Sequence, residues 1–394
     1  MLHNKDIVVL SDDWGRHPFS CQHLIKQLLP WNRVLWVNTI GYRRLKFSRY
    51  DVGRAFGKIF SWLHHNQGRT DKEEFSENLR VVAPICLPFG SFRSVRALNA
   101  LSIISAVKRA SRAWGMRNPL FLTTLPTAAD LPGRIGEGAS TYYCVDDFTL
   151  WPGVDGDLMQ RLEQRLLPKV DLIIATAAQL QKTRINSIRP TELLTHGVDL
   201  EHFQRVGKCE AAPPVRDLSG QVVAYYGLID ERCDMDLLMD LALSMPNVTF
   251  LIVGPWRIPS GKLAELPNVR LIGRVSYDDL PAYLTPASAL ILPYLVNDLA
   301  ASINPLKLKE YLATGLPVVS TPLPEVLKLK KYVRVASGAG QMREVLQTVL
   351  TEEVHSVSPA LQDFLRDQTW QAKAEEFSSM VESIMDYETT GCNA

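Results

Sequence analysis

The stretch SINPLKLKEYLATGLPVVST contains a lysine at a place where helix electrostatics disfavour one. Asn304-Pro305 is typical of a helix start, with Asn as the cap and Pro in the first turn, and Gly315 is typical of a helix end. Lys307 then falls in the first turn, where the helix dipole is already positive. A phosphate or other anion bound at that helix end would explain the cation. The alternative is an ion pair with Glu310, three residues further on the same face.

Two adjacent carboxylates follow an apolar run in the stretch YYCVDDFTLWPG. Asp146 and Asp147 stand where a strand is predicted to end, which is the edge at which parallel sheets bind their ligands. An Asp within hydrogen-bonding reach of a hydroxyl can act there as a general base. The alternative is that one of the two only caps the loop, as Asp does in many turns. We expect at least one of them at the active site, with Asp146 slightly favoured.

A third group of polar side chains lies after the first predicted strand, in SDDWGRHPFSCQHL. Arg16 could meet an anionic ligand there, and His17 could take part in the chemistry. A lone His in such a loop is more often structural, and this alternative stays open. The six cysteines are scattered without a C-x-x-C pair, which argues against a zinc site and against a disulfide framework.

Apolar runs of strand length alternate with amphipathic stretches along the whole chain. Runs of Val, Ile and Leu interleaved with helices are typical of parallel sheets covered on both faces, so the predicted fold class is α/β. Twelve runs are predicted as strands: 6–11, 33–39, 79–85, 119–125, 140–146, 170–176, 221–227, 248–254, 269–273, 289–294, 317–321 and 332–337.

The 394 residues suit two domains of ordinary size. Residues 206–220 lose periodicity and concentrate Pro and small side chains, so we predict an interdomain linker there. The N-terminal domain is then expected over 1–205 and the C-terminal domain over 221–370. A final amphipathic helix is expected over 371–394, packing back on the N-terminal domain.

Composition and charge narrow the classes of partner. The net charge of +1 gives no overall field for nucleic acid, and no nucleic-acid motif is present. No signal-peptide pattern and no apolar run of about 18 residues is found, so we expect a cytoplasmic protein. Residues 43–65 and 93–117 are rich in Lys and Arg, and the first also in aromatic side chains. This pattern suggests that the protein binds peripherally to the inner face of the plasma membrane, through anionic lipids. The alternative is that these segments form an ordinary solvated surface.

Six segments of the second half, taken in order, resemble the nucleotide-sugar-binding domain of GT-B-fold glycosyltransferases. The segments are THGVDLEHF, YYGLIDERCDMDLL, FLIVGP, LPNVRLIGRVSYDDLPAYL, LILPY and NPLKLKEYLATGLPVVSTPLPEV. The resemblance is strongest to the retaining group 1 enzymes of the family-four type, which include sucrose synthases and enzymes of bacterial polysaccharide and teichuronic-acid assembly. It covers residues 140–330 well and the first 130 residues loosely. It implies two Rossmann-like, doubly wound parallel-sheet domains facing a central cleft.

The resemblance also implies a donor site. Glu310 would bind the ribose hydroxyls and Lys307 the diphosphate, which would supply the anion missing from the helix end. The donor-side residues that match by position are Gly227, Arg232, Arg274, Ser302, Asn304, Lys307 and Glu310. On the acceptor side the resemblance places Asp146 and Asp147 beside the donor sugar, and Arg16 and His17 across the cleft.

The chain departs from the family pattern at two points. The first of the two family glutamates is replaced by Ser302, which leaves sugar recognition and the stereochemical outcome open, with retention favoured over inversion. The Arg and Lys that follow the first strand's glycine are replaced by Leu228 and Cys233. Arg232 could substitute for them, and an exposed surface role is the alternative.

The expected function is transfer of a sugar from a nucleotide-diphosphate sugar, with UDP the expected nucleotide, to a lipid-linked or surface polysaccharide acceptor. No cofactor and no metal are expected, because the resemblance implies that helix ends and cations bind the leaving diphosphate. The two D-x-D stretches, CDMD and DGD, fall at predicted helix starts, where Asp is a common cap. A nucleotide-sugar epimerase of the same fold and a non-catalytic GT-B-like binding protein are the rival functions.

Overall fold

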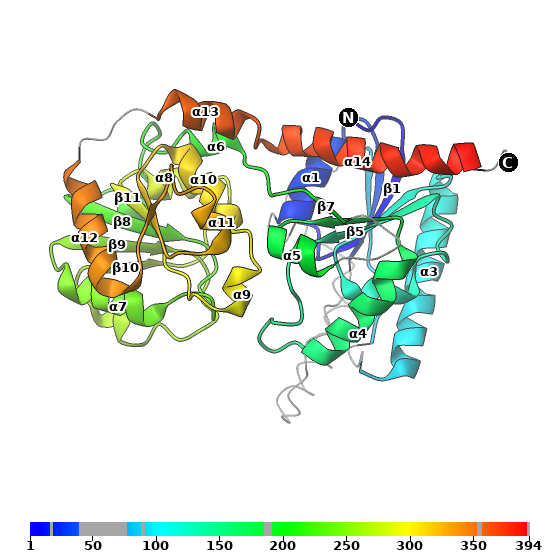
Figure 1. The fold of residues 1–394 in the computed structure, drawn as a ribbon, viewed down its shortest axis with the longest axis horizontal. Helices are drawn as coiled ribbons and strands as arrows, with labels where there is room; N and C mark the ends of the chain where they lie inside the picture. The colour runs from blue at the N-terminus through cyan, green and yellow to red at the C-terminus, as the bar shows by residue number, and fades with distance from the viewer. Residues whose placement is uncertain (16–18, 39–76, 88–90, 185–190, 353–356, 392–394) are drawn as a thin grey trace. The chain divides into compact units, whose positions relative to one another are not determined.

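The computed structural model describes residues 1–15, 19–38, 77–87, 91–184, 191–352 and 357–391. The chain divides into two compact units. Unit 1 comprises Met1–Ala175, Thr183–Glu192 and Glu375–Ala394, and unit 2 comprises Thr176–Lys182 and Leu193–Ala374. Each unit is built on one parallel sheet (Figure 1).

The sheet of unit 1 has the order β3-β2-β1-β4-β5-β6-β7, so the chain winds outward from β1 in both directions. The strands are β1 (Asp6–Ser11), β2 (Arg33–Asn38), β3 (Leu79–Val82), β4 (Leu120–Thr123), β5 (Ala139–Cys144), β6 (Leu172–Ala175) and β7 (Thr191–Leu193). In the centre, Val8 is in register with Leu35 on one side and Phe121 on the other. Every residue of β4, β5 and β6 is buried, because helices cover both faces.

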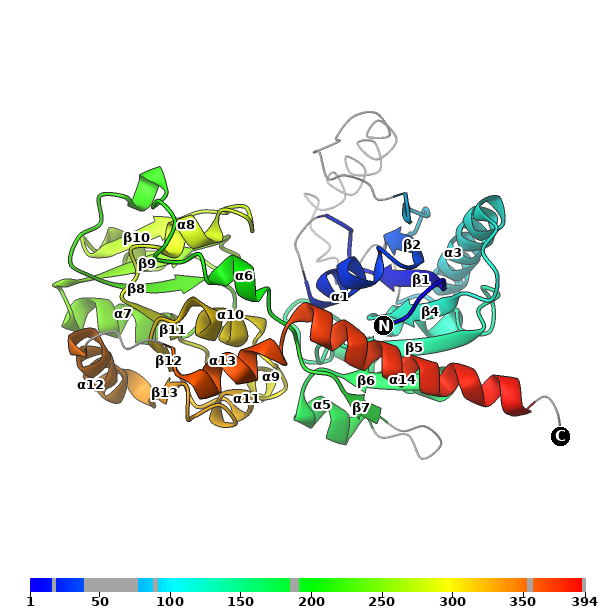
Figure 2. The ribbon, with the colours of Figure 1, turned by 90° about the horizontal axis from the view of Figure 1, so that it is seen from above.

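Helices α1 (Ser20–Leu28) and α14 (Trp370–Gly391) lie on one face of this sheet, and α3 (Arg93–Trp114) and α4 (Gly156–Leu166) on the other (Figure 1). Figure 2 shows β1, β4 and β5 between the long helices α3 and α14. Unit 1 also contains two 3₁₀ turns, η1 (Pro126–Asp130) and η2 (Leu167–Lys169). The short helix α5 (Ala178–Thr183) follows β6 and belongs to unit 2 except for its last residue.

The sheet of unit 2 repeats the same winding, with the order β10-β9-β8-β11-β12-β13. Its strands are β8 (Gln221–Tyr226), β9 (Val248–Val253), β10 (Val269–Ile272), β11 (Ala289–Leu292), β12 (Val318–Ser320) and β13 (Arg334–Val335). Helices α7 (Met235–Ser244) and α12 (Gly338–Thr351) cover one face, and α8 (Leu280–Leu284) and α10 (Leu306–Thr314) cover the other (Figure 1). The shorter elements are α6 (Leu200–Phe203), η3 (Pro213–Val215), η4 (Gly261–Glu265), α9 (Asp298–Ala301), α11 (Pro324–Leu327) and α13 (Pro359–Arg366).

Two doubly wound parallel sheets confirm the predicted α/β fold class. All twelve predicted strands are present, each ending within a few residues of its prediction. The strand that the sequence did not reveal is β7, whose three half-buried residues, Thr-Glu-Leu, form no apolar run.

The division into units differs from the predicted boundary between 205 and 206. Before residue 205 the chain instead crosses between the units at 175/176, 182/183 and 192/193, and residues 206–220, predicted as a linker, belong to unit 2. Val206 and Val215 are buried in the unit 2 core, and the amide of Ala212 bonds to the carbonyl of Ala282 at 3.0 Å. The Pro-rich composition therefore marks a packed loop of unit 2. Of the C-terminal helix, residues 375–394 belong to unit 1, where Ser378 accepts a hydrogen bond from the amide of Leu2.

Candidate functional site

The start of α10 differs in detail from its prediction. Pro305 is the N-cap residue, in extended conformation, and no side chain caps the helix, so the predicted Asn304 cap was wrong. Asn304 is buried, and its side-chain amide donates instead to the carbonyl of Thr176 at 2.9 Å. This hydrogen bond gives the buried carbonyl oxygen the partner that it needs. The helix ends at Gly315 with φ 79°, as predicted from the glycine.

Lys307 lies in the first turn of α10, and two tyrosine hydroxyls hold its ammonium group. Nζ donates to Tyr225 Oη at 2.7 Å and to Tyr294 Oη at 2.9 Å. It also lies over both rings, 4.6 and 5.2 Å from their centroids. Within the described part of the chain, no carboxylate forms an ion pair with Lys307, so the alternative pairing with Glu310 is not made. The cation therefore sits among aromatic rings at the carboxyl edge of the sheet.

The backbone at the end of β8 makes room for this lysine. Gly227 directly follows β8 with φ 128°, and a Cβ atom on it would overlap the side chain of Lys307. The amide of Gly227 is already used, donating to the carbonyl of Val253 at 2.8 Å. The glycine thus allows close approach of Lys307, in a conformation that other residues rarely adopt.

Arg232 is brought to the same place by the loop that follows β8. The amide of Leu295 donates to the carbonyl of Arg232 at 2.8 Å, which pairs this loop with the segment after β11. The guanidinium makes a two-point contact with Asp230, at 2.8 and 2.7 Å, and lies 5.6 Å from the ring centroid of Tyr294. Its side chain is 14% exposed, so the alternative of an exposed surface role is wrong. Arg232 and Lys307 consequently contact one aromatic ring.

Glu310 lies one turn further along α10 and is 3% exposed. The hydroxyl of Tyr226 donates to its Oε2, and Oε1 has no hydrogen-bond partner among the described residues. Burial raises the pKa of Glu310 to about 7, although the Tyr226 hydrogen bond and the charge of Lys307 oppose the rise. A carboxylate with one oxygen occupied and one unpartnered is suited to accept hydrogen bonds from a diol.

The other two donor-side candidates make different contacts. Ser302 ends α9, is buried, and donates to the carbonyl of Leu299 at 2.8 Å, so its hydroxyl serves the local turn. Arg274 lies two residues after β10, is exposed, and forms no hydrogen bond or ion pair with any residue that the structure describes.

A residue that sequence reasoning did not identify anchors α10 from its other side. Lys309 is buried, and its Nζ donates to Thr195 Oγ1 at 2.9 Å, to Gln368 Oε1 at 2.6 Å and to the carbonyl of His196. These partners lie more than fifty residues away in the chain, so no local pattern indicates the contact.

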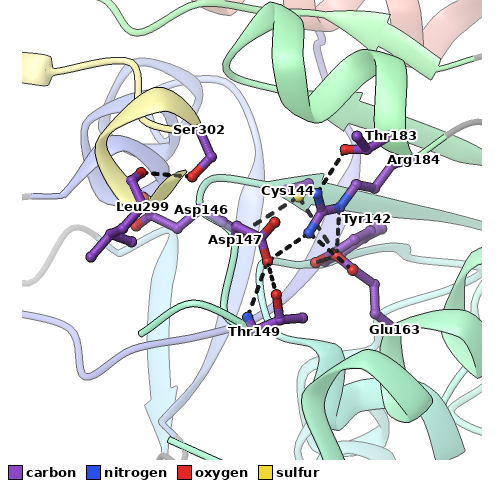
Figure 3. Close-up of polar contacts among 10 residues, drawn as sticks. All are labelled: Tyr142, Cys144, Asp146, Asp147, Thr149, Glu163, Thr183, Arg184, Leu299 and Ser302. Carbon is purple, nitrogen blue, oxygen red and sulfur yellow. Dashed lines mark hydrogen bonds and ion pairs between the residues drawn. The ribbon is translucent and has the colours of Figure 1, made fainter. Parts of the chain in front are cut away.

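In unit 1, Asp146 and Asp147 follow β5 as predicted (Figure 3). Asp147 Oδ1 accepts hydrogen bonds from the amide of Thr149 at 3.1 Å and from its hydroxyl at 2.5 Å, which is the loop-capping geometry of the alternative interpretation. The carbonyl of Asp146 lies 3.7 Å from Cys144 Sγ, which donates to it. Asp146 is half-buried, and its backbone is held in the turn after β5 by this contact.

Sequence reasoning also missed the partner of Asp147. Arg184 is 6% exposed and its Nη2 lies 2.9 Å from Asp147 Oδ1 and 3.2 Å from Glu163 Oε2 (Figure 3). Glu163 is buried and accepts a hydrogen bond from Tyr142 at 2.8 Å. Its position on the apolar face of α4 was the available indication.

The remaining candidates lie outside the described residues. These are Arg16 and His17, together with residues 43–65. Over the part of the chain that is described, His, Cys, Asp and Glu side chains nowhere gather in threes as metal ligands would. No described helix combines the length and hydropathy that crossing a bilayer needs.

Comparison with known proteins identifies the domain that carries α10. Residues 221–351 match the family model described as Glycosyl transferases group 1. A curated relative from Bacillus subtilis (strain 168), named "Putative teichuronic acid biosynthesis glycosyltransferase TuaH", is 29% identical over 182 residues. The match spans 44% of this chain and 46% of that protein, less than half of each.

Solved structures match nearly the whole chain. Sucrose-phosphate synthase from Thermosynechococcus elongatus has a TM-score of 0.71 at 15% identity, covering 98% of this chain and 100% of that one. Alr3699/HepE from Anabaena, in complex with UDP and glucose, has a TM-score of 0.65 at 13% identity, covering 95% and 99%. A UDP-forming trehalose-phosphate synthase from Burkholderia xenovorans has a TM-score of 0.65 at 12% identity, covering 96% and 99%. At these identities the likeness establishes the GT-B fold.

Proposed function

We propose that the protein is a glycosyltransferase that moves a sugar from a UDP-linked donor to a lipid-linked or surface polysaccharide acceptor. The observation that carries the proposal is Lys307, a cation that has no carboxylate partner among the described residues and lies at the sheet edge of a domain that matches the group 1 model. The guanidinium of Arg232, paired with Asp230, is a second cation at the same Tyr294 ring. The UDP named for HepE and for the trehalose-phosphate synthase supports this donor class, and the teichuronic acid named for TuaH supports the acceptor class.

The donor chemistry follows from the contacts of α10. The ammonium of Lys307 has three N–H donors, of which two are directed at Tyr225 and Tyr294. The third can bind a phosphate oxygen and stabilise the negative charge that develops on the leaving diphosphate. Glu310 Oε1 accepts hydrogen bonds from the ribose hydroxyls. These groups act without a metal ion, which is the condition we propose for the reaction.

On the acceptor side, we assign the role of orienting or deprotonating the attacking hydroxyl to the turn after β5, with Asp146 as the carboxylate. A retaining transfer needs this group to position the acceptor, whereas an inverting transfer needs it as a general base. We favour retention of the anomeric configuration, because the sequence resembles the retaining group 1 enzymes most strongly. Ser302 is too short to make the sugar contact of the glutamate it replaces, so the sugar must be bound by other groups.

The exposed surface of α3 supports a lipid-linked acceptor, because it suits contact with a membrane. This helix carries no acidic residue, and its exposed side chains Leu98, Leu101, Arg109 and Arg112 share one face at 100° per residue. Phe92 and Ile85 beside it are 62% and 67% exposed. Apolar and cationic side chains on one face suit the interface of an anionic membrane, and we propose that the enzyme works there on a lipid-carried acceptor.

Thermal unfolding with UDP, GDP, ADP or no nucleotide tests the donor site. A ligand at about 100 times its Kd stabilises the folded state by about 2.7 kcal/mol, enough to raise Tm by several degrees. We expect a shift with UDP that is lost in Lys307→Ala and kept in Lys262→Ala, an exposed lysine of the same unit. No shift with any nucleotide would contradict the proposal.

Turnover separates the rival functions. A transferase releases UDP from a UDP-sugar faster when an acceptor is added. An epimerase converts the sugar without releasing UDP. Nucleotide binding without either reaction would favour a non-catalytic binding protein.

A further inference from the structure

Arg184 is a buried cation shared by two carboxylates from different elements, the loop after β5 and helix α4 (Figure 3). Its Nε also donates to Glu163 Oε1 at 3.3 Å, and its Nη1 to Thr183 Oγ1 at 2.8 Å. Tyr142 donates to Glu163 as well, so this carboxylate has a neutral partner besides Arg184. Asp147 has no second cation among the described residues, and depends on Arg184 for its charge balance.

The contacts of Asp147 fix one end of its carboxylate. Oδ1 receives the Arg184 guanidinium and both donors of Thr149, whereas Oδ2 has no partner among the residues that the structure describes. Burial raises the pKa of Asp147, but the hydrogen bonds from Arg184 and Thr149 outweigh burial, and the net pKa lies below its ordinary value. Asp147 is therefore ionised at neutral pH and poorly matched to proton transfer there.

This division of contacts separates the two adjacent aspartates. Asp147 is turned into its own loop and held by Arg184, while the carbonyl of Asp146 is anchored by Cys144 at the end of β5. We propose that Arg184 is a positioning residue for sugar transfer: by clamping Asp147 it fixes residues 145–149 and thereby the carboxylate of Asp146. The inference rests on the proposed function, because it assigns Asp146 to the acceptor hydroxyl.

A purely structural role for Arg184 predicts a different outcome. In that case any change that weakens the Asp147–Arg184–Glu163 cluster lowers activity in proportion to the loss of folded protein. Positioning instead predicts that only the Asp147 side of the cluster affects turnover. Arg184→Ala would leave two buried carboxylates without their cation and fail to fold, so milder variants are needed.

Two variants separate the sides of the cluster. Arg184→Lys keeps the charge but loses the planar fork that reaches both carboxylates. Glu163→Gln removes the ion pair on the α4 side and leaves the contact between Arg184 and Asp147. Both variants weaken the cluster and lower Tm, which makes Glu163→Gln the matched control.

Release of UDP from a panel of UDP-sugars, with lipid-linked glycan extract as acceptor, gives the kinetic readout. We expect kcat to fall about 100-fold in Arg184→Lys, as for a misplaced catalytic group, with the KM for the donor and the UDP-induced Tm shift unchanged. Glu163→Gln should keep turnover within a few-fold of the wild type. Equal losses in both variants, tracking their Tm, would overturn the proposal.

A second readout needs no substrate and so distinguishes failure of this inference from failure of the proposed function. Carboxyl NMR should show the pKa of Asp147 higher in Arg184→Lys than in the wild type, and faster amide exchange at Thr149 and Leu150. Glu163→Gln should leave the amide exchange unchanged. An unmoved Asp147 titration in Arg184→Lys would overturn the clamp whatever the activity, whereas a wild type without turnover refutes the proposed function alone.

Discussion

The carboxyl group of Glu310 combines deep burial with one hydrogen-bond donor, the hydroxyl of Tyr226. Its pKa of about 7 lies above the value of 4.5 that the unfolded chain gives it. Between these two values the folded protein retains a proton that the unfolded chain has released. Stability therefore falls as pH rises from about 4.5 to about 7, and the ionised form is the one that can accept both ribose hydroxyls. The folded protein is thus less stable in the protonation state that the proposed donor binding requires.

Glu310→Gln tests this conclusion, because glutamine stays neutral at every pH. We expect the free energy of unfolding of the wild type, relative to the variant, to decrease by about 3 kcal/mol from pH 4.5 to pH 8. The same variant should lose most of the UDP-induced Tm shift at pH 8. Urea unfolding at both pH values measures the difference. Glu344→Gln, at an exposed position of α12, is the control, and parallel pH curves for wild type and Glu310→Gln would refute the assignment.

At the residue scale, side-chain types were predicted better than side-chain contacts. Lys307 was identified because a first-turn cation opposes the helix dipole, and this argument needs only the sequence. Arg184 was not identified, because its partners lie 21 and 37 residues away in the chain and no local spacing connects them. Asn304 was assigned to a cap because the type suits it, whereas a buried carbonyl of a distant segment determined its contact.

At the scale of elements, the proposed donor site depends on how closely the end of β8 approaches the first turn of α10. Gly227 provides that approach, since any side chain there would displace Lys307. The strands themselves were predictable, because doubly covered parallel strands are continuous apolar runs. The loops after β8 and β11, which bring Arg232 to Tyr294, were not predictable, because their pairing is made by backbone groups.

Gly227→Ala measures the importance of this approach. Gly220 is a matched control, because it also has a positive φ, of 79°, but no atom lies within 4 Å of the Cβ position. Both substitutions put an alanine at a positive φ and cost stability on the order of 1–3 kcal/mol, with the larger cost expected at Gly227, whose φ of 128° lies further from the left-handed helical region. The comparison between the two variants is therefore made on binding and not on stability. We expect Gly227→Ala to weaken UDP binding at least tenfold by calorimetry, and Gly220→Ala to leave binding unchanged. Equal effects on binding would show that Lys307 does not need its present position.

At the scale of the whole molecule, the near-zero net charge conceals an uneven distribution. Residues 93–117 contain six basic side chains and no acidic one, within a chain of net charge +1. In the structure residues 93–114 of this stretch form α3, and two leucines and two arginines lie together on its exposed face. The amide of Leu87 and the side chain of Asn99 are bonded at 2.7 Å, which fixes exposed apolar residues of the preceding loop beside this helix. This surface is the observation on which the proposed contact with an anionic lipid interface rests.

Vesicle binding tests the membrane proposal. Each cation near an anionic surface contributes about 1 kcal/mol, so reversing both charges in Arg109→Glu/Arg112→Glu should weaken binding by at least tenfold. We expect the wild type to co-sediment with vesicles containing phosphatidylglycerol and not with phosphatidylcholine alone. Lys262→Glu/Arg270→Glu makes the same charge change at exposed positions of unit 2 and should leave binding unaltered apart from a small long-range effect. If both double variants lost binding equally, net charge rather than the α3 face would be responsible, and the acceptor would have to reach the enzyme in another way.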